Sequence, residues 1–550
     1  MNRFEAQQTL FANAPTRAAL QALNIDSRIR ITRNVNVWRN HAIEPIISLA
    51  EPYFRYGEWH VKFTLSDYDD TLSFSESNAA DLEIIWINSE RYINSTSVDD
   101  WIFWLISRLT TLRKSSKAPI LICTWLSTNE DSDQLTEAIK RVPACYFADL
   151  RASCGYADLP LLDSRTLAIS GTPLNPKLHA IIARELACRW MPACLLPPIK
   201  AIAIDLDNTL HAGILGEDGQ DKVKIDKRHI QLQQQLCELQ ERGIFLALVS
   251  RNEESDVKAL FANRFDYPLR WEHFTVKEVS WGEKSAAIAR IADALRIGLD
   301  SILFVDDNPG EVLSVVSKFP AIHTILADAE AELTGQAIAN YPALWRWSID
   351  ESDKKRVFDL EANAEREHMF KVAETTESYI SSLCVKLIIH VNPIDQLKRL
   401  SDLCIKTNQF NLALRRFSEA EVAERISCNN RCVVSVSLSD KLSDSGVIAV
   451  IIAEQHGCKL IVEELCISCR AMGRQLENSI IFMAIRAMPQ FQECDEVVFR
   501  VNHGPRNQPA QGWLAKVLSL ASLPGSGLYS LNLSTINEFN IPDGLVISIS

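Results

Sequence analysis

The sequence predicts a multidomain α/β protein in which at least one domain is built on a parallel sheet. In the middle of the chain, short apolar runs end abruptly on polar residues, and helical patterns separate each run from the next. Runs of four or five apolar residues suit buried parallel strands, and their alternation with helices indicates βαβ units. At 550 residues the chain is also too long for one core, so its length suggests about three domains.

The composition is that of an ordinary globular protein, with 47% hydrophobic and 23% charged residues. A net charge of −13 argues against a general nucleic-acid binder. Residues 1–20 lack the apolar core of a signal peptide, and no apolar stretch is long enough to span a bilayer, so we expect no membrane partner. The fourteen cysteines are scattered and complete no zinc pattern, which favours a cytoplasmic protein with reduced thiols.

Residues 199–325 carry the strongest functional signal, because polar side chains stand where the expected strands end. The run 201–204 ends on Asp205 and Asp207. The other groups are Ser250-Arg251-Asn252 after the run 245–249, Lys284 at the start of a helical pattern, and Asp306 after the run 301–305. The carboxyl ends of parallel strands meet at one edge of a sheet, so we expect these groups to share one crevice.

The chemistry that these groups suit is phosphoryl transfer. Asp205 could attack phosphorus and form an aspartyl-phosphate, while Asp207 exchanges a proton with the leaving group or with water. For the Asp-x-Asp pair alone, the competing interpretation is an acidic, solvated turn after a strand.

A hard cation and several donors would support that transfer. Mg²⁺ prefers carboxylate, phosphate and water oxygens, and we expect Asp205, Asp207 and Asp306 to hold it. The phosphoryl oxygens would be bound by Ser250, Arg251, Asn252 and Lys284.

Four segments in this region resemble the motifs of the haloacid-dehalogenase (HAD) superfamily of aspartate-nucleophile phosphotransferases. They are DLDNTL at 205–210, VSRN at 249–252, EKS at 283–285 and FVDDNP at 304–309. The resemblance implies a Rossmann-like parallel sheet. No large insertion separates the motifs, which indicates a capless domain whose open site suits a bulky or protein-borne substrate.

The N-terminal residues 1–195 form an expected α/β region of their own. Strand-like segments lie at 59–63, 82–87 and 120–123, with helical patterns such as 100–112 between them. This layout is similar to SGNH-type hydrolase domains, but no Gly-Asp-Ser block is present. We therefore expect a scaffold or recognition domain without catalytic activity.

Residues 326–375 read as a helical connector, and residues 376–550 as a second α/β domain. A predicted hairpin of strands 447–452 and 460–465 leads into a basic loop and a helix. That loop, with Arg470, Gly473 and Arg474, is similar to the pyrophosphate loop of GNAT acyltransferases. A basic turn before an amphipathic helix is the alternative.

Three further segments resemble the FkbH-like family, which joins a capless HAD domain of subfamily IIIC to a GNAT-like domain. They are KTNQFNL at 406–412, SCR at 468–470 and GILGEDG at 213–219. The family takes a glyceryl unit from 1,3-bisphosphoglycerate, through an enzyme thioester, to the phosphopantetheine of an acyl carrier protein in polyketide-type biosynthesis. His211-Ala212 and the turn at 442–446 depart from the family pattern, so the exact acyl donor stays open.

Cys469 is the candidate for the acyl-carrying cysteine. It stands beside Arg470 and before an expected helix start, both of which favour a reactive thiolate; a buried structural cysteine is the alternative. His503 could serve as an acid or base, or be an inert loop residue.

Two functional hypotheses follow from these patterns. The first is a Mg²⁺-dependent phosphotransferase that transfers a glyceryl unit to an acyl carrier protein. The second is a HAD phosphatase acting on a small phosphorylated metabolite, with flanking domains that only bind a partner.

Overall fold

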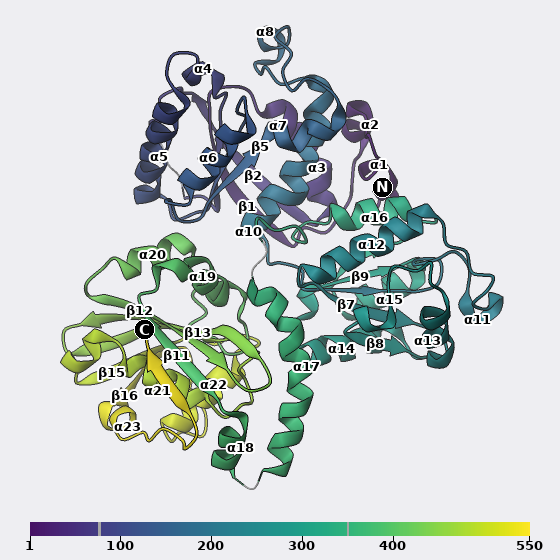
Figure 1. Ribbon diagram of the computed structural model, residues 1–550. Coiled ribbons are helices and arrows are strands. Elements are labelled where there is room, and N and C mark those ends of the chain that lie inside the picture. The colour runs from purple at the N-terminus through teal and green to yellow at the C-terminus, as the bar shows by residue number, and fades with distance from the viewer. Residues whose placement is uncertain (75–78, 349–350, 374) are drawn as a thin grey trace. The chain divides into compact units, whose positions relative to one another are not determined.

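The computed structural model describes residues 1–74, 79–348, 351–373 and 375–550. The chain divides into two compact units, residues 1–349 and 350–550. Parallel sheets with helices on both faces make up the first unit, and a mixed sheet makes up the second (Figure 1). The predicted multidomain α/β fold with parallel sheets is confirmed.

The first sheet of unit 1 has the strand order β2-β1-β3-β4-β5, and all of its strands run parallel. Its strands are β1 (Ile31–Arg39), β2 (Trp59–Tyr68), β3 (Leu82–Trp86), β4 (Ile120–Thr124) and β5 (Cys145–Asp149). Its helices are α1 (Arg3–Leu10), α2 (Arg17–Ala22), α3 (Glu44–Tyr56), α4 (Glu90–Ile93), α5 (Val98–Ser115), α6 (Asn129–Ile139), α7 (Leu150–Cys154), α8 (Leu167–Ser170), α9 (His179–Glu185) and α10 (Met191–Leu195).

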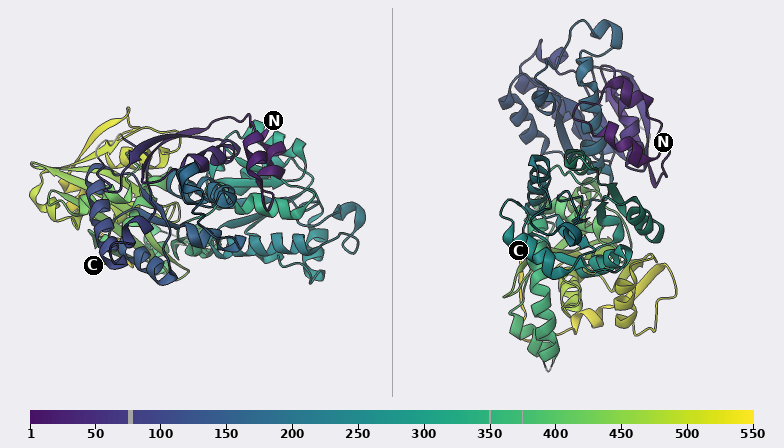
Figure 2. Two further views of the ribbon diagram at one scale, coloured as in Figure 1. Left: turned by 90° about the horizontal axis from the view of Figure 1, so that it is seen from above. Right: turned by 90° about the vertical axis from the view of Figure 1, so that its right-hand side faces the viewer.

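The side chains of β3 and of the residue after it point alternately to the two faces of this sheet, and each face is covered by different helices. Ile84 and Trp86 pack into the core that includes α3 and α9, whereas Ile85 and Ile87 pack into the core under α5 and α6. Successive side chains of a strand point to opposite faces, so a strand that is buried along its whole length, as β3 is, needs cover on both sides. Figure 2 shows these helical layers from two further directions.

The second sheet of unit 1 has the order β10-β9-β6-β7-β8 and is also entirely parallel. Its strands are β6 (Ala201–Ile204), β7 (Phe245–Ser250), β8 (Val276–Val279), β9 (Ile302–Asp306) and β10 (His323–Leu326). Its helices are α11 (Leu215–Asp218), α12 (Lys227–Glu241), α13 (Glu254–Asn263), α14 (Lys284–Leu295), α15 (Pro309–Lys318) and α16 (Ala331–Ala339). Strand β6, which has only four residues, lies at the centre between β7 and β9.

The two sheets of unit 1 share one hydrophobic core, which contains side chains of α1, α3, β6 and α16. Arg3 also reaches from α1 to β10, where its guanidinium donates to the backbone oxygen of Thr324 at 2.9 Å. The predicted boundary between residues 195 and 199 falls inside this unit, in the segment between α10 and β6. The four domain bounds of the sequence analysis stay a prediction; residues 349–350 and 374 of the proposed connector lie outside the described residues.

Unit 2 begins with the long helix α17 (Glu351–Val372) and contains a seven-stranded sheet of order β16-β15-β14-β13-β12-β11-β17. The strands are β11 (Lys386–Val391), β12 (Arg431–Ser439), β13 (Asp444–His456), β14 (Lys459–Ile467), β15 (Glu496–Val501), β16 (Gly527–Asn532) and β17 (Val546–Ile549). The helices after α17 are α18 (Thr376–Leu383), α19 (Leu397–Lys406), α20 (Glu419–Ile426), α21 (Glu477–Arg486), α22 (Gln508–Val517) and α23 (Leu533–Asn537).

The predicted hairpin is present in unit 2 as β13 and β14, which pair antiparallel. The next strand, β15, pairs parallel with only the first four residues of β14, Lys459–Val462. Past that point, residues 410–412 take the place beside β14. Leu412 donates to the Leu465 oxygen at 3.0 Å, and Ile467 donates to the Phe410 oxygen at 2.9 Å.

Within the described ranges, no helix combines the length and the apolar character that crossing a bilayer requires.

Candidate active site

The second sheet of unit 1 brings together the polar groups that the sequence places at strand ends. Asp205 directly follows β6, Ser250 is the last residue of β7, and Asp306 is the last residue of β9. These three strands are neighbours, so their carboxyl ends form one edge. The backbone N–H of Asp205 donates to the Val305 oxygen at 2.9 Å, which extends the β6–β9 pairing to the site itself.

Lys284 bridges two of these carboxylates. It is the first residue of α14, and its Nζ lies 2.9 Å from Asp205 Oδ1 and 2.6 Å from Asp306 Oδ2. The three side chains are 6%, 7% and 0% exposed, so the ion pairs are shielded from water. A cation held in this way is positioned to contact an oxygen of a phosphoryl group that approaches Asp205.

Burial dominates the electrostatics of these carboxyl groups. Burial, aided by the nearby Asp306 and opposed by Lys284, raises the pKa of Asp205 to about 8. Burial also raises the pKa of Asp306 against the effect of Lys284. For Lys284 itself, the two aspartates outweigh burial and raise the pKa of the ammonium group. Burial of two carboxyl groups around one ammonium group therefore disfavours their charged forms, and a further cation bound beside them would favour the carboxylates.

Three carboxylates in this site are close enough to share a metal ion. One carboxylate oxygen from each of Asp205, Asp306 and Asp307 lies within 4.8 Å of the other two. Hard oxygen ligands of this kind fit Mg²⁺. The sequence pattern predicts Asp207 rather than Asp307 in this set, and a metal contact of Asp207 stays a prediction. Asp307 is the residue that sequence reasoning missed, although its place beside Asp306 at a strand end was a signal for it.

The carboxylate of Asp207 is held by three donors from different parts of the chain. Asn252 Nδ2 donates to Oδ2 at 2.7 Å, and the backbone N–H of Leu215 donates to Oδ1 at 2.9 Å. His211 Nε2 lies 3.2 Å from the same Oδ1. Burial acts to raise the pKa of Asp207, but these hydrogen bonds outweigh it and lower the pKa. Its side chain is therefore fixed beside Asp205 as a carboxylate.

The segment after β6 forms a small flap next to the site. Ala212 and Lys224 exchange both backbone hydrogen bonds, at 2.8 and 2.9 Å, which closes the flap at its base. Gly213 has φ of 106°, and an added Cβ there would meet Asp218 Oδ2 at 2.9 Å, so this turn requires glycine. His211 is completely buried, and its ring contacts that of Tyr267.

The predicted phosphate-binding residues differ in exposure. Ser250 and Asn252 are both buried, and Asn252 Nδ2 donates to Ser250 Oγ at 2.9 Å as well as to Asp207. Arg251 points outward, where its guanidinium pairs with Glu311 at 2.8 Å. Ser250, Asn252 and Lys284 thus line the inner site, while Arg251 lies at its rim.

In unit 2, the predicted basic loop is longer than expected. Helix α21 begins at Glu477, so Cys469 lies eight residues before it rather than at its N-terminus. Cys469 is half-buried, and its neighbour Arg470 is buried. Gly473 has φ of 78° with open space around it.

Arg474 occupies an internal position. Its guanidinium lies 3.2 Å from Asp359 Oδ1 and 3.1 Å from Asp440 Oδ2, and these side chains are almost completely buried. Arg366 pairs with the same two aspartates. The positive charges of two arginines and the negative charges of two aspartates balance here. Because only Asp359 and Arg366 lie on α17, these ion pairs stabilise the packing of α17 against the sheet of unit 2.

The segment 406–412 packs against the ends of β14 and β15. Buried Glu464 accepts hydrogen bonds from the backbone N–H groups of Ala413 at 3.1 Å and Arg415 at 2.5 Å. Burial raises the pKa of Glu464 to about 7 despite these donors. His503 is exposed in the loop after β15, where its backbone N–H donates to Ser526 Oγ.

The first sheet of unit 1 has no serine at the end of β1. Asn40 stands there, and its side chain accepts from the backbone N–H of Asn88 at 2.8 Å and donates to Asp70 at 2.9 Å. An amide that joins the ends of neighbouring strands is a structural link rather than a nucleophile.

Comparisons with known proteins were made for the whole chain. No protein-family model and no curated protein matches it. Among solved structures, it is similar to the N-terminal part of a Bacteroides fragilis protein containing a phosphatase domain complexed with Mg, at 17% identity and TM-score 0.45, over 63% of this chain and 100% of that chain. It is also similar to a spermidine N-acetyltransferase mutant from Vibrio cholerae, at 10% identity and TM-score 0.21, over 27% of this chain and 95% of that one.

A third similarity is to a glucosamine N-acetyltransferase region of a fungal multi-domain β-N-acetylglucosaminidase, at 9% identity and TM-score 0.18, over 94% of this chain and 66% of that one. At these values none of the three bears on activity, and the site geometry has to carry the assignment.

Proposed function

We propose that residues 199–325 form a Mg²⁺-dependent phosphatase or phosphotransferase of the HAD type, with Asp205 as nucleophile. The observation that carries this proposal is the carboxylate cluster of Asp205, Asp306 and the partly buried Asp307, in which Lys284 pairs with Asp205 and Asp306 at the ends of adjacent parallel strands. A nucleophile, a fixed ammonium group and a cluster of hard ligands within one crevice are the parts that phosphoryl transfer requires.

The residues divide the reaction between them. An oxygen of Asp205 attacks phosphorus, and the bond from phosphorus to the leaving oxygen breaks while that oxygen takes a proton from solvent. Water then attacks the aspartyl-phosphate, Asp207 takes its proton, and phosphate leaves. Lys284, Ser250 and Asn252 bind the phosphoryl oxygens throughout. Mg²⁺, when held by Asp205, Asp306 and Asp307, offsets the repulsion between carboxylate and phosphate.

Replacement of the nucleophile tests this proposal. Asp205→Asn should lower phosphate release from an aryl phosphate by at least several hundredfold, because an amide cannot attack phosphorus. Asp256→Asn, at an exposed position of α13, is the matched control and should keep full activity. An Asp205→Asn enzyme with more than about a tenth of the wild-type rate would contradict the assignment.

We further propose that the substrate is 1,3-bisphosphoglycerate and that the glyceryl unit passes through Cys469 to the phosphopantetheine of an acyl carrier protein. The resemblance at 406–412 and 468–470 supports this, and so does the half-buried position of Cys469 in the loop before α21. Arg470, Gly473 and Arg474 of that loop are the proposed contacts of the pantetheine phosphate, and His503 is the proposed acid or base.

In the transfer step, the phosphoryl group on carbon 3 passes to Asp205, the Cys469 sulfur attacks the acyl carbon, the phosphate on carbon 1 leaves, and a glyceryl thioester forms. The pantetheine thiol then attacks the thioester and releases Cys469. Intact-mass measurement after incubation with Mg²⁺ and 1,3-bisphosphoglycerate should show a glyceryl adduct on the wild type and none on Cys469→Ala. Cys428→Ala, at another half-buried cysteine of unit 2, is the control and should keep the adduct.

One observation favours the simpler alternative, a phosphatase whose flanking domains only bind a partner. Arg474 is buried in ion pairs with Asp359 and Asp440, which directs its charge into the protein. Phosphate release without any adduct on the wild-type enzyme would select this alternative.

A further inference from the structure

The first sheet of unit 1 has one face that is only partly covered by helices. Over β3 and β4 this face is apolar apart from Glu83, and together with Trp38 of β1 it packs under α5 and α6. Over β1 and the edge strand β2 the corresponding positions are polar, with Asn36 paired to Thr64 across the two strands. The helices therefore cover only half of this face.

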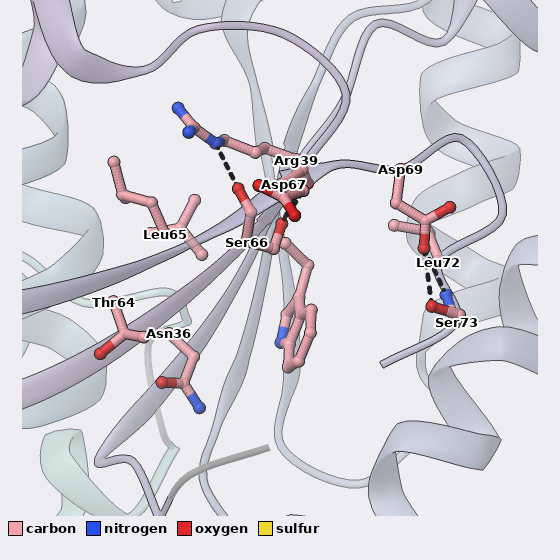
Figure 3. Close-up of a pocket in the computed structure, with 11 residues that line it drawn as sticks. Asn36, Arg39, Thr64, Leu65, Ser66, Asp67, Asp69, Leu72 and Ser73 are labelled. Carbon is pink, nitrogen blue, oxygen red and sulfur yellow. Dashed lines mark hydrogen bonds between the residues drawn. The ribbon is translucent and has the colours of Figure 1, made fainter. Parts of the chain in front are cut away.

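A cavity of about 370 Å³ opens on the polar half, near the carboxyl ends of β1 and β2. Figure 3 shows Asn36 and Thr64 on one side of it, Arg39 and Ser66 above, and the loop with Asp69 and Ser73 on the other side. The volume is enough for a molecule the size of a monosaccharide. In open α/β sheets, ligands bind at the carboxyl ends of the strands.

The inner wall of the cavity is fixed by a buried carboxylate. Glu83 on β3 is completely buried, and it accepts from Trp38 Nε1 at 2.8 Å and from Asn36 Nδ2 at 3.5 Å. A carboxylate buried with only neutral donors costs free energy. Here it orients the indole and the amide that line the cavity.

The charges that face the cavity are mostly negative. The guanidinium of Arg39 is neutralised by Glu44 at 2.5 Å and donates to the Ser66 oxygen at 2.8 Å. Asp69 is engaged by the backbone and hydroxyl groups of its own loop. The carboxylate of Asp67, by contrast, makes no ion pair with the described residues. An anionic ligand such as a phosphate would be repelled by this carboxylate. The guanidinium of Arg39, which lines the cavity, is already paired with Glu44.

We propose that this cavity binds a small polyhydroxylated molecule that carries an amino group. Its ammonium group would pair with Asp67, and its hydroxyls would bond to Thr64, Ser66 and Asn36. Trp38 and Leu72, which also line the cavity, would supply apolar surface for the ring. This site is independent of the phosphoryl-transfer site and goes beyond the function proposed above.

Three probes of the same size separate the contributions of charge and hydroxyl groups: glucosamine, glucose and gluconate. Binding to the full chain is measured by ligand-detected NMR titration. Glucosamine should bind about fivefold more tightly than glucose, which is what one partly exposed ion pair supplies. Gluconate should bind more weakly than both.

Two substitutions assign the binding to this cavity. Asp67→Asn should remove the preference for glucosamine over glucose, and Thr64→Val should weaken both. Asp133→Asn, at an exposed position of α6, is the control and should change neither. Circular dichroism confirms that each variant is folded. The proposal is overturned if gluconate binds as tightly as glucosamine, if none of the probes binds, or if Asp67→Asn keeps the preference.

Discussion

The buried position of Lys284 makes its removal the sharpest test of the active-site geometry. Lys284→Met keeps the length of the side chain but deletes the ammonium group that lies 2.9 Å from Asp205 and 2.6 Å from Asp306. Both aspartates then stay buried without their cation, close enough to repel each other. We expect the variant to unfold more easily than the wild type in metal-free buffer.

The size of the effect follows from the two contacts. A hydrogen bond to a charged group contributes about 1.5–3 kcal/mol, and breaking a buried pair by removing one partner costs about 3–5 kcal/mol. We therefore expect a loss of about 3–5 kcal/mol in the free energy of unfolding of unit 1. Because carboxylates can instead take up a proton or a metal ion, Mg²⁺ should restore part of this loss.

Urea unfolding followed by tryptophan fluorescence measures this loss, since eleven of the twelve tryptophans precede residue 350. The midpoint should fall by at least about 1 M for the expected change. Lys318→Met is the control, because its ion pair with Glu283 is 3.9 Å long and the two side chains are 51% and 76% exposed. Lys318→Met should lower the free energy of unfolding by less than about 0.5 kcal/mol. Equal midpoints for Lys284→Met and wild type would refute the buried ion pairs.

Three other outcomes follow from the structure. EDTA should stop phosphate release and added Mg²⁺ should restore it, whereas full activity in metal-free buffer would contradict the carboxylate site. Cys469→Ala should lose glyceryl transfer to a carrier protein in a mass spectrum of the carrier; normal transfer would remove Cys469 from the reaction. Burial raises the pKa of Glu464 to about 7 in the folded protein, so the folded state holds this proton more tightly than the unfolded chain does. Unit 2 therefore loses stability as the pH rises from the pKa of Glu464 in the unfolded chain toward 7. Between about pH 5.5 and about pH 8, hydrogen exchange at 407–416 should report a loss of about 2 kcal/mol in wild type and none in Glu464→Gln; equal pH dependence in both would contradict it.

Local sequence determined much of the candidate active site. The runs 201–204, 245–249 and 301–305 could become little other than buried strands, because they are short, apolar and bounded by polar residues. A parallel sheet then brings the residues after each run to the same edge. This is why Asp205, Ser250 and Asp306 meet as the sequence predicts.

Side-chain direction, by contrast, was decided only by the tertiary structure. Neither spacing nor residue type reveals that Asp207 turns toward Asn252 and His211 while Asp307 joins the carboxylate cluster, since both follow strands and both are acidic. Arg474 shows the same limit, because the partners that bury it, Asp359 and Asp440, are distant in the chain. Local pattern fixes where a strand ends, but the packing of distant segments fixes what each side chain then faces.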